Sequence, residues 1–296
     1  MSSDVTSDLV QVRARHRRSR LVQVSSRLLA NPSGRIGLVG LGLFVVVAVA
    51  ASLLAPYDPL EPDYGAVLQA PSSEHLFGTD QLGRDVLSRV IYGARISLTV
   101  GFVPVAAAFI VGTAIGVLSG FIGGRFDATI MRLTDIGLAF PGILLALVVV
   151  AVLGPGLSNV MIALGIADVP LAIRVARGST LSIGAQPYVQ SAIAVGCRDR
   201  RILLRYILPG VTAPVLIVAT LEVANAILIA SGLSFLGLGA QPPAPEWGAM
   251  LAQAQAQIQT AWWAAVFPGI AIVLAVLAIN LLGDGFRDAL DPKARR

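Results

Sequence analysis

The sequence is poor in charge, and it nearly lacks cysteine and histidine. Only 13% of its 296 residues are Asp, Glu, Lys or Arg, about half the roughly 25% of an average soluble domain. The single Cys197 excludes an internal disulfide, and His16 and His75 stand too far apart to suggest a metal site. We therefore expect neither a disulfide-stabilised scaffold nor a metal centre in this chain.

The sequence motifs of nucleotide hydrolysis are missing as well. The phosphate-binding pattern Gly-x-x-x-x-Gly-Lys-Ser/Thr does not occur, and the glycine-rich stretch from Gly120 to Gly124 contains no lysine. No nucleophile is paired with an evident base. The sequence predicts no enzymatic activity, no catalytic residues and no cofactor bound by this chain itself.

Hydrophobic residues dominate what is present. They make up 55% of the chain, and the mean hydropathy is +0.78. A helix that crosses the roughly 30 Å hydrocarbon core of a bilayer needs about 20 apolar residues. The segments that meet or approach this length are residues 36–55, 96–120, 136–153, 157–173, 211–236 and 262–282. The expected fold class is an all-α integral membrane protein with six transmembrane helices.

The basic residues give these spans a direction. Of the 22 Lys and Arg residues, 19 fall in the terminal segments and in the second-to-third and fourth-to-fifth connections, whereas Arg84, Arg89 and Arg95 lie on the other side. The positive-inside rule then places both termini in the cytoplasm. Orientation and contact with anionic membrane lipid explain the net charge of +5, so the sequence predicts no nucleic-acid partner.

A domain organisation follows from the spans. The apolar run that begins at Ile36 is too long and starts too late for a signal peptide, so we expect an uncleaved first helix. The expected parts are a basic cytoplasmic tail at 1–35, a transmembrane helix at 36–55, an extracytoplasmic loop at 56–95, a membrane core at 96–285 and a cytoplasmic tail at 286–296.

The extracytoplasmic loop carries charges of alternating sign. Asp80, Arg84, Asp85 and Arg89 stand near helical spacing, at which residues four apart form ion pairs on one helix face. With Thr79 as the capping residue, the pattern predicts an amphipathic surface helix on the outer leaflet.

The connection at residues 188–209 is basic and contains two helix-compatible stretches. The first runs from Tyr188 to Val195 and the second from Cys197 to Tyr206, with Gly196 between them, where a left-handed backbone costs little. Pro209 suits the first turn of the fifth span. The sequence therefore predicts a helix–turn–helix at the cytoplasmic membrane surface, with a face of small residues that fits a groove on a soluble partner.

This spacing resembles the EAA loop of ABC importer permeases, in which Glu-Ala-Ala is followed by three residues, Gly, nine residues and Ile-x-Leu-Pro. The positions in register are Ala192, Gly196, Leu208 and Pro209, and the departures are Gln190 for Glu, Ser191 for the first Ala and Tyr206 for Ile. In that family the loop is the coupling helix that inserts into the ATPase subunit. The candidate coupling residues are Gln190, Ser191, Ala192, Gly196, Cys197, Arg198, Asp199, Leu208 and Pro209.

Three further strings, at residues 75–98, 234–251 and 280–292, are similar to signatures of the C-type permease subunits of bacterial dipeptide, oligopeptide and nickel ABC importers. The resemblance covers roughly residue 75 to the end, and it implies a type I importer permease fold in the bacterial cytoplasmic membrane. It also implies four kinds of partner: a second, related permease, two ATPase subunits that bring ATP and Mg, an extracytoplasmic peptide-binding protein and membrane lipid. Transport would proceed by alternating access.

Polar residues within the spans are candidates for a transport pathway, because ionisable groups in a bilayer are costly and often functional. Glu222 lies near the middle of the fifth span with Asn225 one turn on, and either a pathway role or an interhelical hydrogen bond explains it. We expect Asp168, in the fourth span, to pair with Arg174 or Arg177.

Other functions remain open at this point. Nickel-chelate and glutathione permeases share the signature strings with peptide permeases. A secondary transporter would need coupling groups at the midplane, often on inverted repeats, and the sequence offers only Glu222 and no repeat.

Overall fold

The computed structural model describes residues 28–290. Most of the predicted basic tail at 1–35 and the end of the predicted tail at 286–296 lie outside this range. Within it the chain is helical, and its one β-type pairing is an isolated antiparallel bridge between Thr79 and Asp85.

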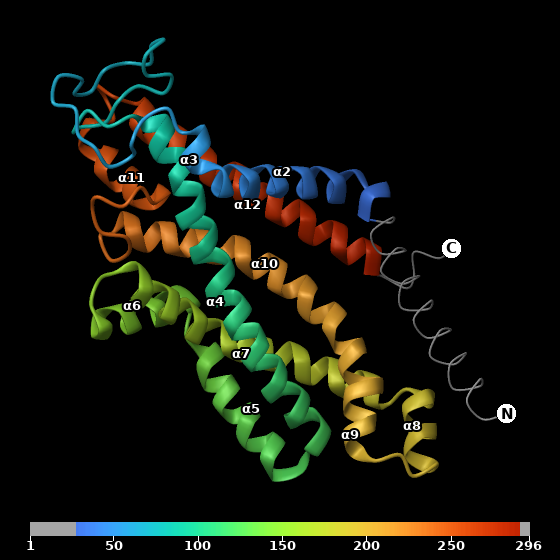
Figure 1. The fold of residues 1–296 in the computed structure, drawn as a ribbon. Helices are drawn as coiled ribbons and strands as arrows, with labels where there is room; N and C mark the ends of the chain where they lie inside the picture. The colour runs from blue at the N-terminus through green and yellow to red at the C-terminus, as the bar shows by residue number, and fades with distance from the viewer. Residues whose placement is uncertain (1–27, 291–296) are drawn as a thin grey trace.

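The helices form an elongated bundle (Figure 1). They are α2 (Pro32–Val49), α3 (Ala51–Leu54), α4 (Val86–Ile122), α5 (Gly124–Ala139), α6 (Gly142–Leu153), α7 (Leu157–Gly184), α8 (Pro187–Ala194), α9 (Asp199–Ile202), the π-helix η1 (Leu203–Ile207), α10 (Leu208–Phe235), α11 (Trp247–Ala254), the 3-10 helix η2 (Gln255–Gln257) and α12 (Trp263–Leu290). Five of the spans have the length and hydropathy to cross a membrane, or six if the bent pair α5 and α6 counts as one.

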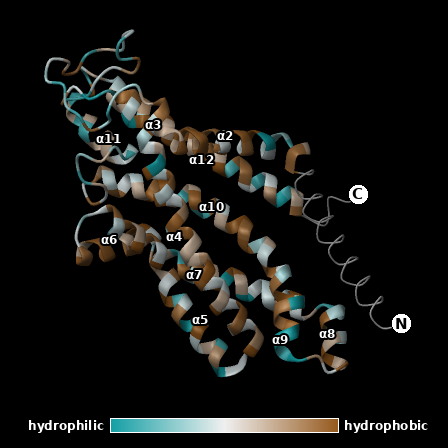
Figure 2. Cartoon of the chain, viewed as in Figure 1, coloured by the Kyte–Doolittle hydropathy of each residue, from teal (hydrophilic) through white to brown (hydrophobic). Residues whose placement is uncertain are grey.

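The two ends of the bundle differ in character. At one end, here called the α11 end, the long segment between α3 and α4 lies beside α11 (Figure 1). The other end, here called the α8 end, gathers α8, α9 and the turn between α4 and α5. Hydrophobic residues cover much of the helices between these ends, and hydrophilic residues concentrate in the segment between α3 and α4 (Figure 2).

The third predicted span, 136–153, is not one straight helix. The chain breaks at Phe140 and Pro141, and α5 and α6 meet at 88°. A residue before proline is pushed out of the helical region, and Phe140 accordingly has an extended backbone (φ −92°, ψ 134°). The apolar run therefore continues through the break while the helix direction does not.

Other spans are longer than hydropathy predicts. The helix α4 begins at Val86 rather than near residue 96, and α7 continues past residue 173 to Gly184. Their additional turns contain charged residues, which a hydropathy window counts against a span although they lie on the same helices.

The bundle is held by the contact of α4 with α7. Three glycines spaced four apart on α4 face α7, and a Cβ built on Gly112 would lie 2.5 Å from the Ala172 Cβ, while one on Gly116 would lie 2.4 Å from the Ile173 carbonyl oxygen. At Gly120 the nearest atoms, 3.1 Å away, belong to Thr180. Small residues at such spacing let transmembrane backbones approach closely.

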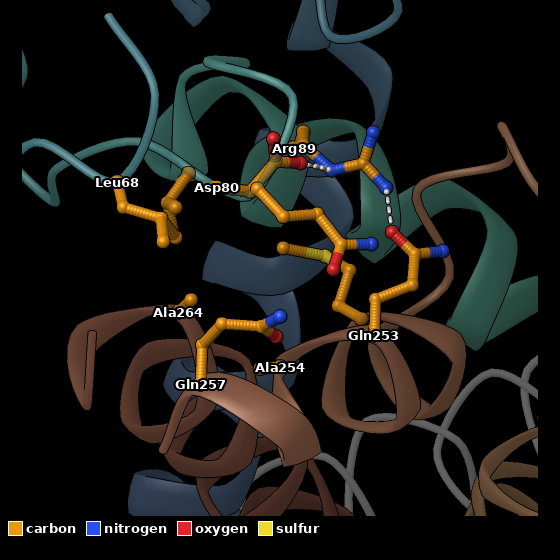
Figure 3. A pocket seen from close by; sticks show the side chains of 10 residues that line it. Leu68, Asp80, Arg89, Gln253, Ala254, Gln257 and Ala264 are labelled. Carbon is orange, nitrogen blue, oxygen red and sulfur yellow. Dashed lines mark hydrogen bonds and ion pairs between the residues drawn. The ribbon is translucent and has the colours of Figure 1, made fainter. Parts of the chain in front are cut away.

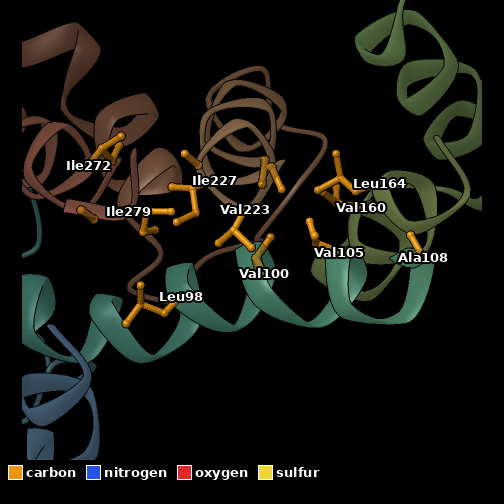
Figure 4. Close-up of a cluster of buried hydrophobic side chains, with 14 of the residues drawn as sticks. Leu98, Val100, Val105, Ala108, Val160, Leu164, Val223, Ile227, Ile272 and Ile279 are labelled. Carbon is orange, nitrogen blue, oxygen red and sulfur yellow. The ribbon is translucent and has the colours of Figure 1, made fainter. Parts of the chain in front are cut away.

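The buried side chains on the other side of α4 form the hydrophobic core. Val100 of α4 lies beside Val223 of α10 there, with Leu98 and Val105 to either side of it along α4 (Figure 4). Gly101 lets α4 and α10 approach closely here, since a Cβ at this position would lie 2.5 Å from the Ile227 side chain. Helix α4 is therefore packed against α7 on one face and α10 on another.

We expect the substitution Gly116→Val to destabilise the protein by about 1–3 kcal/mol, the usual cost of overpacking a close contact, and to lower its thermal midpoint in detergent. The matched control is Gly42→Val on α2, where a Cβ has no heavy atom within 4 Å. Equal midpoints for the two variants would contradict the role of the α4–α7 contact.

Candidate functional site

At the α8 end, a short helix ends in a glycine turn. The N–H of Gly196 donates to the Ile193 carbonyl (2.9 Å) and that of Cys197 to the Ala192 carbonyl (3.0 Å). With Gly196 at φ +77°, this is a Schellman motif, in which the left-handed residue is usually glycine. The predicted interruption of the helix at Gly196 is confirmed, and the backbone conformation is its reason.

Helix α8 is fastened to the chain on both sides. The Gln190 side-chain nitrogen donates to the carbonyl of Gly184 at the end of α7 (2.7 Å), a bond that a carboxylate at this position would be unable to donate. The rings of Tyr188 and Tyr206 lie 6.4 Å apart. Gln190, which stands where the EAA pattern has Glu, therefore makes a hydrogen bond that Glu would not donate.

One face of this segment is buried and the other presents apolar side chains to solvent. Val189 and Ala192 are buried, whereas Ile193 is 49% and Val195 84% exposed. These residues lie between two helical spans that are long and apolar enough to cross a membrane, Leu157–Gly184 and Asp199–Phe235. Exposed apolar surface of this kind marks an interaction site.

The second half of the segment continues without a break into a transmembrane helix. We expected a separate short helix from Cys197 to Tyr206, followed by a new helix at Pro209. Instead α9, η1 and α10 form one helical run from Asp199 to Phe235. The N–H of Leu208 donates to the carbonyl of Leu203, five residues back, which makes this a π turn. In a regular α-helix the Pro209 ring would clash with the preceding turn, and the wider π turn lies at that place.

Ion pairs join α7 to α5 at the same end. Two nitrogens of Arg177, Nε and Nη2, donate to the Asp127 carboxylate, at 2.6 and 2.5 Å, and Arg174 pairs with Asp135. The expected pairing of Asp168 with one of these arginines is therefore wrong, because α5 supplies nearer partners for both.

Asp168 instead lies on α7, which packs against α10, the helix that carries Glu222. The Asn225 amide donates to Glu222 (3.2 Å), and Asn225 is exposed. At about 1.5 Å per residue, Glu222 lies roughly 20 Å along the helix from Pro209, deep in a core of about 30 Å. Polar side chains at this depth face a protein interior or a water-filled cavity rather than lipid.

At the α11 end, the expected surface helix around Asp80 to Arg89 does not form. Residues 79–85 make a turn, with Gly83 at φ +76° and so close to Asp63 that a Cβ would lie 1.7 Å from its carbonyl oxygen. Asp85 accepts from the Ser88 N–H (2.8 Å) and caps α4. The charges that were expected to be solvated are buried, and Arg89 is only 1% exposed.

These buried charges connect the segment before α4 to α11. Asp80 pairs with Arg84 (2.8 Å) and Arg89 (3.5 Å), and both guanidiniums donate to the Gln253 side-chain oxygen on α11. Figure 3 shows Arg89 between Asp80 and Gln253. Arg89 also donates to the Pro59 carbonyl (3.1 Å). Because buried charges need such partners, the cluster fixes the cap at this end of the bundle.

A buried carboxyl group completes the cap. Glu246 accepts from the N–H groups of Gly248 (3.0 Å) and Ala249 (2.8 Å) and caps α11, and burial raises its pKa. Next to it, Trp247 is fully buried and donates to the Val90 carbonyl (3.0 Å). The α11 end is thus assembled from segments far apart in sequence, joined by buried hydrogen bonds.

The architecture is similar to that of a solved transporter structure. An inward-facing structure of the MetNI methionine ABC transporter matches with a TM-score of 0.58 at 18% identity, covering 69% of this chain and 97% of that chain. The fold is therefore that of an ABC importer permease.

Residues 112–296 match the family described as binding-protein-dependent transport system inner membrane component, and residues 19–71 match the N-terminal transmembrane domain of oligopeptide transport permease C. The chain belongs to this family of membrane permeases, which are transport proteins rather than enzymes. The second match extends the resemblance to a region before residue 75, outside the three signature strings.

Two relatives are similar to this chain over most of their length. The dipeptide transport system permease protein DppC of Alkalihalophilus pseudofirmus is 46% identical over 269 residues, which cover 91% of this chain and 88% of the relative. The glutathione transport system permease protein GsiD of Escherichia coli is 50% identical over 254 residues, which cover 86% of this chain and 84% of the relative.

Proposed function

We propose that this chain is the permease subunit of an ATP-driven importer that carries dipeptides or short oligopeptides into the cell. The proposed substrate class rests on one observation: most of the chain is similar to a dipeptide permease and to glutathione permeases. Glutathione is itself a tripeptide, so the two names agree on a short peptide substrate.

The chain works with partners. Its proposed assembly contains a second, related permease, two ATPase subunits that bind ATP and Mg, and an extracytoplasmic peptide-binding protein. The α8 end faces the cytoplasm in this arrangement and the α11 end faces outward. The charge asymmetry of the sequence supports this orientation, and the exposed Ile193 and Val195 support ATPase contact at the α8 end.

The continuous helix from Asp199 to Phe235 gives the coupling a route. A displacement of α8 by the ATPase moves the Schellman turn at Gly196, and the rigid run of α9, η1 and α10 passes that displacement to the middle of the membrane. Glu222 and Asn225 lie on this same helix. ATP-driven movement at one end therefore reaches the polar surface that we assign to the pathway.

In the pathway, Glu222 contacts the ammonium group of the peptide. Asn225 donates to the Glu222 carboxylate (3.2 Å) and orients it. A cationic group is the natural partner for a carboxylate at membrane depth.

The function is tested by uptake of radiolabelled dipeptide into proteoliposomes that contain the co-purified complex, binding protein and ATP. We expect Gly196→Ala to lower ATP-dependent uptake, since a non-glycine residue in the left-handed conformation costs about 1–2 kcal/mol. Gly196→Asn should retain more uptake than Gly196→Ala, because Asn tolerates that conformation.

A Cβ on Gly196 meets no heavy atom within 4 Å, so size alone should have little effect. The control is Gly178→Ala on α7, which has the same open surroundings within a regular helix. Dipeptide uptake that needs neither ATP nor partner subunits would overturn the proposed function, and equal loss in the Ala and Asn variants would refute the role of the turn.

For the pathway, we expect Glu222→Gln to reduce dipeptide uptake at low substrate concentration by roughly tenfold, the loss typical of a hydrogen bond to a charged group. ATPase activity without peptide should stay near that of the unsubstituted complex. Thr220→Val is the control, because this hydroxyl donates within its own helix, to the Ile217 carbonyl (2.8 Å). Unchanged uptake in the Glu222→Gln complex would remove the residue from the pathway.

A further inference from the structure

An apolar groove runs between α4 and α10 toward the α8 end. It has a volume of about 710 Å³, within the range of roughly 300–1,000 Å³ typical of small-molecule sites. The side chains along it are almost all hydrophobic, among them Phe109, Ile110 and Leu118 of α4 and Leu208 and Leu216 of α10. Three threonines also line it: Thr212 and Thr220 donate to carbonyls of their own helix, and the buried Thr113 hydroxyl has no hydrogen-bond partner within residues 28–290.

Four arginines surround a second hollow at the cytoplasmic end of this groove. Arg198, Arg200, Arg201 and Arg205 line a space of about 350 Å³. All four are exposed, and within residues 28–290 none of them takes part in an ion pair. Asp199 is the one acidic residue among them in the sequence. The hollow is therefore strongly positive.

The two spaces meet at Leu204, which lines both of them. Arg201 and Arg205 lie within one turn of this leucine on the same helical run, while the groove continues along α10 as far as Val223. At about 1.5 Å per residue, that length exceeds the depth of one leaflet of a core of roughly 30 Å. Charge lies at the membrane boundary, and apolar surface extends from it into the hydrocarbon.

We propose that the groove and the four arginines together form a binding site for one anionic phospholipid of the cytoplasmic leaflet. Its phosphate lies among the arginines, which favour phosphate through their forked donors, and an acyl chain fills the groove between α4 and α10. Charge complementarity selects this occupant, since a free phosphate would leave the groove unused and an acidic protein surface would reach only the arginines.

The site has a mechanical consequence. It joins α4 to the run of α9, η1 and α10 next to the turn at Gly196, on the helix that carries the proposed coupling movement. A bound lipid would stiffen this junction, so the lipid composition of the membrane would set how well the movement of α8 reaches α10. Lipid binding itself is independent of the transported substrate.

The test uses the full-length chain, purified in detergent with its co-expressed subunits and depleted of lipid. Native mass spectrometry then measures retention of added phosphatidylglycerol, with phosphatidylcholine as the neutral probe. We expect R201Q/R205Q to weaken phosphatidylglycerol binding by roughly thirtyfold, in line with the contribution of two basic residues near an anionic surface. Ala219→Phe, which fills the groove far from the arginines, should weaken it as well.

The matched control is R125Q/R132Q, which removes the same charge from exposed positions on α5. Selective loss of phosphatidylglycerol in the first two variants and not in the control establishes the site. Three results would overturn it: equal loss in the control, loss in R201Q/R205Q with full binding in Ala219→Phe, or unchanged lipid binding with loss of the ATPase subunits. The last result would assign the arginines to the ATPase contact.

Discussion

The structure depends on how closely α4 approaches α7. Burial of apolar side chains gives little drive for helix association inside a bilayer, because lipid is as apolar as the helices. Gly112 and Gly116 therefore take the place that larger residues would hold in a water-soluble core, and backbone meets backbone there. With α4 fixed on α7, its other face can hold α10 through Val223 and Ile227 (Figure 4).

The two ends of this frame are built differently. Buried ion pairs around Arg89 and a buried Glu246 hold the α11 end together. At the α8 end, the short α8 is fastened by Gln190 and the turn at Gly196, and it presents exposed Ile193 and Val195. The uninterrupted helix from Asp199 to Phe235 connects that end to Glu222.

The sequence predicted the class, the helical fold and most of the spans, because hydropathy reports directly which segments are long enough to cross a bilayer. It also predicted the turn at Gly196, where local conformation requires glycine. Features that depend on distant residues were predicted wrongly. Arg89 was expected in solvent but is buried by α11, Arg174 and Arg177 pair with α5 rather than with Asp168, and the spacing of charges near Gly83 indicated a helix that the contact with Asp63 excludes.

The coupling role that we propose for α8 is tested most directly by cross-linking from a single introduced cysteine. Val195→Cys in a Cys197→Ser background places one thiol on a residue that is 84% exposed. In the assembled complex this thiol is expected to cross-link to an ATPase subunit, with a yield that changes when ATP binds. In the permease without its ATPases, the same thiol is expected to react with a membrane-impermeant maleimide only from the cytoplasmic side. Labelling from the outer side, or a free thiol that never reaches an ATPase subunit in an ATP-hydrolysing complex, would contradict it.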